Sequence, residues 1–244
     1  MKRLLGGLLV FAICAVGAAR AAERVDLALV LAADVSRSVD ADKFELQRKG
    51  YAAAITDRRV LDAIRSGTQR RIALMFIEWS GMFSQQVVID WTLIDGAKAA
   101  QAFAEKLLES PRSFADRTSI SAGIDFAVKQ LAKLPYFAER QTIDVSGDGT
   151  NNSGLPITAA RDAAVALGIT INGLVILSEH PLPWNPAHTN PPGGLAAYYR
   201  DNVVGGPGAF VMQAKNFNSF GDAIIKKMIA EIAANPRPSR LAPG

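Results

Sequence analysis

Residues 25–38 read VDLALVLAADVSRS, and this stretch decides the fold. Its first part, Val25 to Ala33, is an almost continuous apolar run, which is typical of a strand buried on both faces of a parallel sheet. The run ends in D-x-S-x-S, so that Asp34, Ser36 and Ser38 follow one another within a single turn. One carboxylate and two hydroxyls are hard oxygen donors of the kind that Mg²⁺, Mn²⁺ or Ca²⁺ accepts. The stretch therefore predicts a strand whose carboxyl end carries part of a cation site.

Two later pieces of the chain would complete such a site. Thr118 follows a loop, and Asp148 follows the apolar run from Thr142 to Ser146. Ligands of an open parallel sheet lie outside the carboxyl ends of its strands, and neighbouring strands are about 4.8 Å apart, so one cation can be reached from two strands. The alternative is that these side chains only cap helices. The predicted metal ligands are Asp34, Ser36, Ser38, Thr118 and Asp148.

Apolar runs of strand length alternate with longer segments of helical periodicity, which indicates a parallel sheet flanked by helices. We expect strands at residues 25–33, 71–79, 86–93, 142–146, 169–177 and 209–213, and helices at 40–64, 95–108, 119–134, 156–167, 195–203 and 218–233. The link at residues 80–84 is too short for a crossover, so the strands on either side of it must be antiparallel. The prediction is a doubly wound α/β fold: six strands, mostly parallel, with one antiparallel edge strand and helices on both faces.

The amino terminus has the pattern of a secretory signal peptide. Lys2 and Arg3 precede an apolar stretch that is shorter than the roughly 20 residues a bilayer span needs, and a small-x-small cleavage pattern follows it. Cys14 is preceded by Ile13 rather than by the small residue that a lipobox requires. We therefore expect a signal peptide at residues 1–21, a single domain at 22–234, a disordered tail at 235–244, and a periplasmic or secreted protein.

Removing this leader changes the charge balance. The whole chain has 27 basic and 23 acidic residues; without Lys2, Arg3 and Arg20 the formal charge falls from +4 to +1. A nearly neutral domain lacks the electrostatic footprint of a nucleic-acid-binding protein. The only cysteine leaves with the leader, so the core must hold the fold without disulfides. The mature chain is also expected to have no membrane span.

The order of the three metal-binding pieces resembles the von Willebrand factor A (vWA) family, whose metal-ion-dependent adhesion site (MIDAS) combines D-x-S-x-S, a distant Thr and a distant Asp-Gly. The resemblance implies that Ser36, Ser38 and Thr118 ligate the cation directly, and that Asp34 and Asp148 act directly or through water. One departure is Asp116-Arg117 before Thr118, where the family usually has glycine. The segments 78–81, 143–149 and 171–174 are similar to a bacterial family of exported vWA-like proteins without an assigned function.

Other polar and aromatic side chains are candidates for an outer layer of the site. Glu78 is a candidate acid behind the ligands, and Trp79 is either a platform for a ligand or part of the core. Asp144 lies within a predicted strand, where a buried structural role is favoured. His180 and His188 lie in a Pro-rich loop and are expected to be solvated, with metal binding together with Glu179 as the alternative. Trp184 in the same loop is expected to contact a partner.

The predicted function is an exported binding module whose cation, Mg²⁺ or else Mn²⁺ or Ca²⁺, receives an acidic group from a protein or peptide partner. The chain lacks G-x-S-x-G, a phosphate-binding glycine loop and G-x-G-x-x-G after its first strand, which argues against hydrolase, nucleotide triphosphatase and dinucleotide functions. A metal-dependent phosphoesterase or other hydrolase on the same scaffold remains the alternative.

Overall fold

Strand β2 (Leu27–Asp34) lies in the middle of a six-stranded sheet in a computed structural model that describes residues 22–178 and 181–234. The predicted leader, the predicted tail and His180 lie outside the described residues. The strand order is β4-β3-β2-β6-β7-β8. The other members are β3 (Ile72–Trp79), β4 (Gln85–Ile94), β6 (Gln141–Gly147), β7 (Thr170–Ile176) and β8 (Val211–Ala214).

All neighbouring pairs in this sheet are parallel except β3 and β4. The predicted six-stranded sheet with one antiparallel edge strand is therefore confirmed. Two short strands, β1 (Arg24–Val25) and β5 (Phe137–Ala138), form a small separate parallel pair at the amino-terminal end of the sheet.

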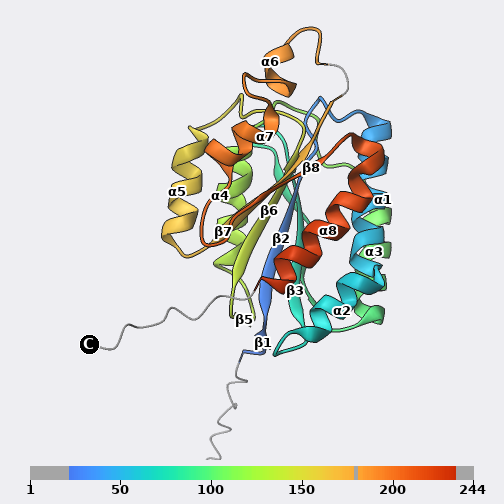
Figure 1. Ribbon diagram of the computed structural model, residues 1–244. Coiled ribbons are helices and arrows are strands. Elements are labelled where there is room, and N and C mark those ends of the chain that lie inside the picture. The colour runs from blue at the N-terminus through green and yellow to red at the C-terminus, as the bar shows by residue number, and fades with distance from the viewer. Residues whose placement is uncertain (1–21, 179–180, 235–244) are drawn as a thin grey trace, which may run out of the picture.

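Helices cover both faces of the sheet (Figure 1). One face carries α1 (Ala41–Thr56), α2 (Arg58–Ser66), α3 (Ala97–Glu109) and α8 (Phe220–Ala233), the last preceded by the short turn η2 (Phe217–Ser219). The other face carries α4 (Ile120–Leu131), α5 (Ile157–Ala166), α7 (Leu195–Tyr198) and η1 (Tyr199–Val203). Helix α6 (Pro186–Thr189) lies beyond the sheet, at the top of the view.

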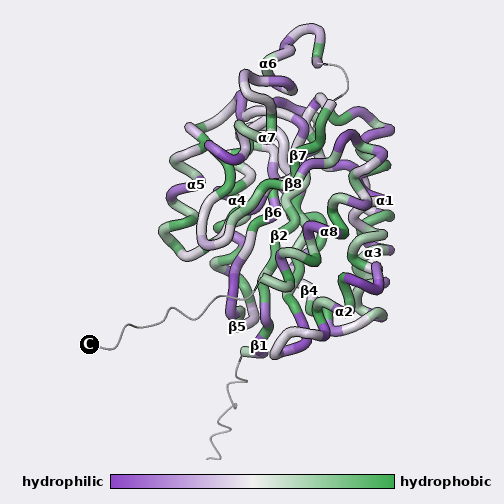
Figure 2. The backbone as a smooth tube through the Cα atoms, viewed as in Figure 1, coloured by the Kyte–Doolittle hydropathy of each residue, from purple (hydrophilic) through white to green (hydrophobic). Residues whose placement is uncertain are grey.

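The apolar run of β2 explains why the sheet is covered twice. Leu27, Leu29 and Leu31 point into the core under α1, α2, α3 and α8, whereas Ala28 and Val30 point into the core under α4 and α5. Alternate side chains of a strand point to opposite faces, so a strand that is apolar at every position needs helices on both sides. In Figure 2 the hydrophobic stretches accordingly gather on the central strands, and hydrophilic stretches are common on the outer helices and loops.

The helix predicted as one segment at residues 40–64 is divided at Asp57. The backbone of Asp57 is extended (φ −63°, ψ 132°), its N–H donates to Ala54 O, and its carboxylate accepts from the N–H of Arg59 at 2.8 Å. One residue thus ends α1 and caps α2. The break lets the chain bend around the end of the sheet, which a single straight helix could not do.

Both ends of the described chain lie at the amino-terminal edge of the sheet. Strand β1 enters there, and Arg140, just before β6, donates from its guanidinium to the carbonyl oxygens of Glu231 and Ile232 at 2.8 and 2.9 Å. These carbonyls belong to the last turn of α8, where a cation is favoured by the helix dipole. Among residues 22–178 and 181–234, no helix is long and apolar enough to cross a bilayer.

Candidate metal centre

The strand register brings the three predicted pieces of the site to one edge of the sheet. Strand β2 pairs with β6 in parallel, and Ala33 is the partner of Ser146, so Asp34 and Asp148 both emerge at the carboxyl-terminal edge. Thr118 reaches the same edge in the loop before α4, because Ser119 N donates to Ser80 O just beyond β3 at 2.7 Å.

Four of the five predicted ligands form one continuous hydrogen-bonded group. The Ser36 N–H donates to Asp34 Oδ1 at 2.7 Å, and the Ser36 and Ser38 hydroxyls are 3.2 Å apart. The Ser38 hydroxyl donates to Asp148 Oδ1 at 2.5 Å. All four side chains are buried. The D-x-S-x-S turn therefore brings two carboxylates and two hydroxyls together.

Each carboxylate keeps one buried oxygen without a hydrogen-bond partner among the described residues: Oδ2 of Asp34 and Oδ2 of Asp148. Burial, and next the nearby charge of Asp148, raise the pKa of Asp34 from 3.8 to about 7. Burial also raises the pKa of Asp148, although the Ser38 hydrogen bond and the charge of Lys43 oppose this. Lys43 Nζ lies 4.0 Å from Asp148 Oδ2, but no cation is paired with Asp34 in the described part of the chain. Two buried carboxylates that interact electrostatically favour a bound cation, because a cation would stabilise the charge of both.

The loop that carries Thr118 is tied to the loop that carries the serines. Arg37 N donates to Asp116 O at 2.9 Å, and the Arg112 guanidinium donates to the carbonyls of Val35 and Ser36 at 2.6 and 2.9 Å. The carboxylate of Asp116 lies beside the Gly81 hairpin, where Ser84 donates to it at 3.4 Å. Asp116 thus joins the loop before Thr118 to two neighbouring loops.

His188 lies at the site, and sequence reasoning placed it wrongly. Its side chain in α6 is only 5% exposed, so the prediction of a solvated histidine is incorrect. Its Nε2 is 3.2 Å from the Thr118 hydroxyl, and its carbonyl accepts from Thr150 N at 2.9 Å. Burial lowers the pKa of the imidazole. Helix α6 therefore covers the edge of the site, and a contact between residues 70 positions apart left no local signal in the sequence.

Tyr199 is a second side chain that sequence reasoning missed. Its hydroxyl is buried without a hydrogen-bond partner among the described residues. Burial, followed by the charges of Asp34 and Asp148, raises the pKa of this phenol. A Cβ on Gly147 would lie 2.5 Å from the Tyr199 hydroxyl and 3.1 Å from Asp34 Oδ2, so glycine leaves the room that both groups occupy.

The residues predicted for an outer layer lie in different surroundings. Glu78 is fully buried; it accepts from the Arg48 guanidinium at 2.5 Å and from Ser113 N at 2.8 Å, so it helps hold the loop that leads to Thr118. Trp79 is also fully buried, and its indole N–H donates to Ala32 O at 3.0 Å. Trp79 thus has no surface on which a ligand could stack.

Asp144 is completely buried on the α8 face of the sheet, away from the cation ligands, where Lys227 Nζ lies 2.7 Å from its Oδ1. The same ammonium group is 2.5 Å from Glu231 Oε1. Burial, and next the charge of Glu231, raise the pKa of Asp144 to about 7, while Lys227 opposes the rise. This buried triad of Asp144, Lys227 and Glu231 fixes α8 to the sheet.

Trp184 is 76% exposed in the loop that leads into α6. Because His188 of α6 contacts Thr118, this loop emerges on the same edge as the predicted ligands. The loop follows β7, which is separated from β2 by β6 alone. The loop therefore begins close enough to the predicted ligands for Trp184 to contact a partner bound there.

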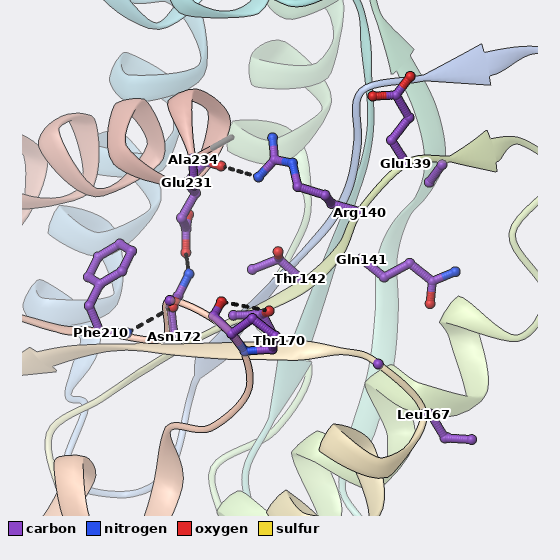
Figure 3. A pocket seen from close by; sticks show the side chains of 14 residues that line it. Glu139, Arg140, Gln141, Thr142, Leu167, Thr170, Asn172, Phe210, Glu231 and Ala234 are labelled. Atoms are coloured by element: carbon purple, nitrogen blue, oxygen red, sulfur yellow. Dashed lines mark hydrogen bonds between the residues drawn. The ribbon is translucent and has the colours of Figure 1, made fainter. Parts of the chain in front are cut away.

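A cavity of about 870 Å³ lies at the opposite end of the sheet, between β6, β7 and α8 (Figure 3). The Asn172 amide donates to Glu231 Oε1 at 2.9 Å and accepts from Phe210 N at 3.1 Å, and Arg140 is bound to the end of α8. The cavity contains none of the predicted site residues, and the polar groups of Asn172 and Arg140 are already bound to protein.

The donor set at the carboxyl-terminal edge fits a hard divalent cation. In the described part of the chain, no three His, Cys, Asp or Glu side chains gather as a metal-binding group. What the site offers instead is two carboxylates with the hydroxyls of Ser36 and Ser38, and the buried Thr118 in a loop at the same edge. Oxygen-only donor sets of this kind suit Mg²⁺, Mn²⁺ or Ca²⁺. Such a cation would satisfy Asp34 Oδ2 and Asp148 Oδ2, which lack hydrogen-bond partners among the described residues.

Solved structures show which fold this protein has. It is similar to a von Willebrand factor type A protein from Catenulispora acidiphila (14% identity, TM-score 0.55) over 86% of this chain and 43% of that one. It is also similar to the pilus adhesin SpaC from Lactobacillus rhamnosus GG (12%, TM-score 0.60; 87% and 31%). A third match is proximal thread matrix protein 1 from the mussel byssus, in a structure with a zinc-occupied MIDAS motif (13%, TM-score 0.53; 87% and 46%). The chain has a vWA-type fold and spans less than half the length of each of these proteins.

The chain belongs to one family of proteins. A family model described as "Protein of unknown function (DUF1194)" matches residues 24–236, which is nearly the whole described chain. A search of curated proteins found no match.

Proposed function

We propose that this protein is an exported binding module in which a divalent cation at the carboxyl-terminal edge receives an acidic group from a protein or peptide partner. The observation that carries the proposal is the pair of buried carboxylates, Asp34 and Asp148, joined through Ser36 and Ser38, with Asp34 Oδ2 lacking a hydrogen-bond partner among the described residues. Asp34, Ser36, Ser38, Thr118 and Asp148 would hold the cation. The two carboxylates balance the formal charge of a dication, and the remaining ligands are neutral hydroxyls. The cation can therefore still bind one further carboxylate as a Lewis acid.

Cation binding is tested by calorimetry with Mg²⁺, Mn²⁺ and Ca²⁺ on the wild type and on Asp34→Ala. We expect the variant to lose the cation while its circular dichroism shows a folded domain. Asp62→Ala is the matched control, because Asp62 is a carboxylate on α2 that is 55% exposed. Equal affinity in Asp34→Ala and the wild type would remove the metal assignment.

Partner binding is tested by capture from envelope extract in Mg²⁺ and in EDTA. A protein retained only with Mg²⁺, and not by Asp148→Ala, would support the adhesion role. Two proteins of similar structure, a pilus adhesin and a byssal thread matrix protein with a zinc-occupied MIDAS motif, support the same role. A prey retained equally in EDTA would contradict it.

The phosphoesterase alternative needs a group that can take a proton from water. His188 is the single imidazole described near the ligands, and both of its ring nitrogens already lie within 3.2 Å of a threonine hydroxyl. This arrangement favours the binding module. Multiple turnover of a generic phosphoester, abolished by Asp148→Ala, would favour the enzyme instead.

Export rests on the leader pattern at residues 1–21, outside the described residues. Mass spectrometry of the protein from its native host should find the mature amino terminus at or next to Ala22. An intact Met1 or a lipid on Cys14 would contradict this part of the proposal.

A further inference from the structure

Thr118, Asn152 and His188 form a closed ring of hydrogen bonds beside the predicted ligands. The Thr118 N–H donates to Asn152 Oδ1 at 3.1 Å, and Asn152 N donates to Thr118 O at 2.9 Å. Asn152 Nδ2 lies 3.4 Å from His188 Nδ1, and His188 Nε2 lies 3.2 Å from Thr118 Oγ1. We call this set the Thr-Asn-His ring. It connects α6 to the loop before α4 and to the segment that follows Asp148.

The backbone of Thr118 determines the direction of every bond in the ring. An N–H can only donate, so the Asn152 atom that faces it must be the carbonyl oxygen, and the amide NH₂ must face His188. An NH₂ group can only donate, so His188 Nδ1 must accept, and the Thr150 hydroxyl, 3.2 Å from the same nitrogen, can also donate to it. The imidazole is therefore neutral, with its proton on Nε2, and it donates to Thr118 Oγ1.

This donated bond determines what the Thr118 hydroxyl can offer. A hydroxyl oxygen has two lone pairs and one proton. One lone pair accepts from His188, so one lone pair remains for a cation. The hydroxyl is held in place before a cation arrives, which reduces the ordering cost of binding. Partners behind metal ligands generally act in this way, and their loss typically weakens metal affinity by about 10- to 100-fold.

We propose that His188 is a positioning residue of the cation site: through its Nε2 proton it fixes the Thr118 oxygen for the cation, and so links helix α6 to cation affinity. This inference rests on the proposed function. It assigns His188 no direct contact with the cation. It also gives the Pro-rich loop a role in metal binding that is separate from any contact of that loop with a partner.

Packing of the imidazole against Gly149 gives an independent way to disturb it. A Cβ on Gly149 would collide with the His188 ring, and the backbone of Gly149 is not in the left-handed region, so alanine would disturb the ring rather than strain the turn. Gly149→Ala should therefore imitate the loss of His188 while keeping the imidazole.

The experiment is a double-mutant cycle on Mn²⁺ affinity, with free Mn²⁺ measured by electron paramagnetic resonance and no polyhistidine tag. His188→Ala should weaken binding by roughly 10- to 100-fold, and Gly149→Ala should do likewise. Thr118→Val removes the oxygen; in that background His188→Ala should change affinity by less than about 2-fold, because the residue acts through that oxygen. His188→Gln, which can place an N–H near the Nε2 position, should restore part of the affinity, whereas His188→Asn should not.

Nitrogen-15 NMR of the metal-free protein supplies a readout that does not depend on the metal. His188 should be neutral with a protonated Nε2 and an unprotonated Nδ1, and His180→Gln assigns its signals because the chain has two histidines. A proton on Nδ1 would overturn the inference. So would an unchanged Mn²⁺ affinity in His188→Ala, or an equal loss in the wild-type and Thr118→Val backgrounds, which would mean that the loop acts only structurally. If the wild type binds no Mn²⁺, the proposed function itself fails.

Discussion

Replacing Asp34 by asparagine should make the cation-free protein more stable at pH 8, even though it removes a predicted ligand. At this pH the wild-type carboxylate is charged, buried and unpaired at Oδ2. Its raised pKa means that the stability it contributes is present when it is protonated and is lost as the pH rises from about 4 towards 7. Asparagine remains neutral and keeps the oxygen that accepts from Ser36 N.

The size of the effect follows from the same pKa. The difference between 3.8 and about 7, at ~1.4 kcal/mol per pH unit, gives an upper limit of about 4 kcal/mol. Asp148 shares the proton uptake, so we expect Asp34→Asn to gain roughly 2–4 kcal/mol of unfolding free energy at pH 8. At pH 5 the folded wild-type side chain is protonated but the unfolded carboxylate is already charged, so the expected gain falls to an upper limit of about 1.7 kcal/mol.

The assay is urea unfolding in EDTA at pH 5 and pH 8, repeated at pH 8 with excess Mn²⁺. Mn²⁺ at a hundredfold excess over its dissociation constant should stabilise the wild type by about 2.7 kcal/mol and leave Asp34→Asn unchanged. Asp62→Asn, on the exposed surface of α2, should behave as the wild type throughout. If Asp34→Asn is no more stable than the wild type at pH 8 in EDTA, the buried-charge argument is wrong.

Three further substitutions examine other parts of the structure. Lys227→Met should lower the unfolding free energy by about 3–5 kcal/mol, because the buried carboxylates of Asp144 and Glu231 lose the ammonium group between them. Lys226→Met, on the exposed side of α8, should cost less than about 1 kcal/mol, and equal losses in urea unfolding would refute the role of the triad. Gly147→Ala should displace Tyr199 and Asp34, destabilise the protein by about 1–3 kcal/mol and weaken Mn²⁺ binding measured by calorimetry. Gly96 has open space around it, so Gly96→Ala should preserve the Mn²⁺ affinity. Trp184→Ala should weaken a metal-dependent partner by about 1–2 kcal/mol without changing Mg²⁺ affinity, and equal partner affinity would leave this exposed side chain without a binding role.

The strands could be predicted from the sequence because burial on both faces leaves a direct pattern. Strand β2 is apolar at every position before Asp34, and only a sheet covered on both faces can bury all of these side chains. The antiparallel hairpin of β3 and β4 followed from the length of its link. The division of the long helix at Asp57 did not, because an aspartate within a helical pattern has the same local signature whether it caps a helix or faces solvent.

The candidate site divides in the same way. D-x-S-x-S is local, so Asp34, Ser36 and Ser38 could be identified together, and the ends of two predicted strands indicated Asp148. His188 could not be identified, because its surroundings are set by Thr118, which is distant in sequence, and by the packing of a loop on Gly149. Lys227 has an ordinary helical context, and its burial depends on a carboxylate in β6. Tyr199 reaches the site through η1, which has no sequence pattern of its own.

The location of both described ends at the amino-terminal edge determines how the molecule can be held. A linker or solid support joined at either end would grip the domain at β1 or beyond α8, on the far side of the sheet from Asp34 and Asp148 (Figure 1). The cation edge would then project away from the support with its loops unobstructed. A biosensor surface prepared through either end therefore displays the side of the domain on which a partner would have to land.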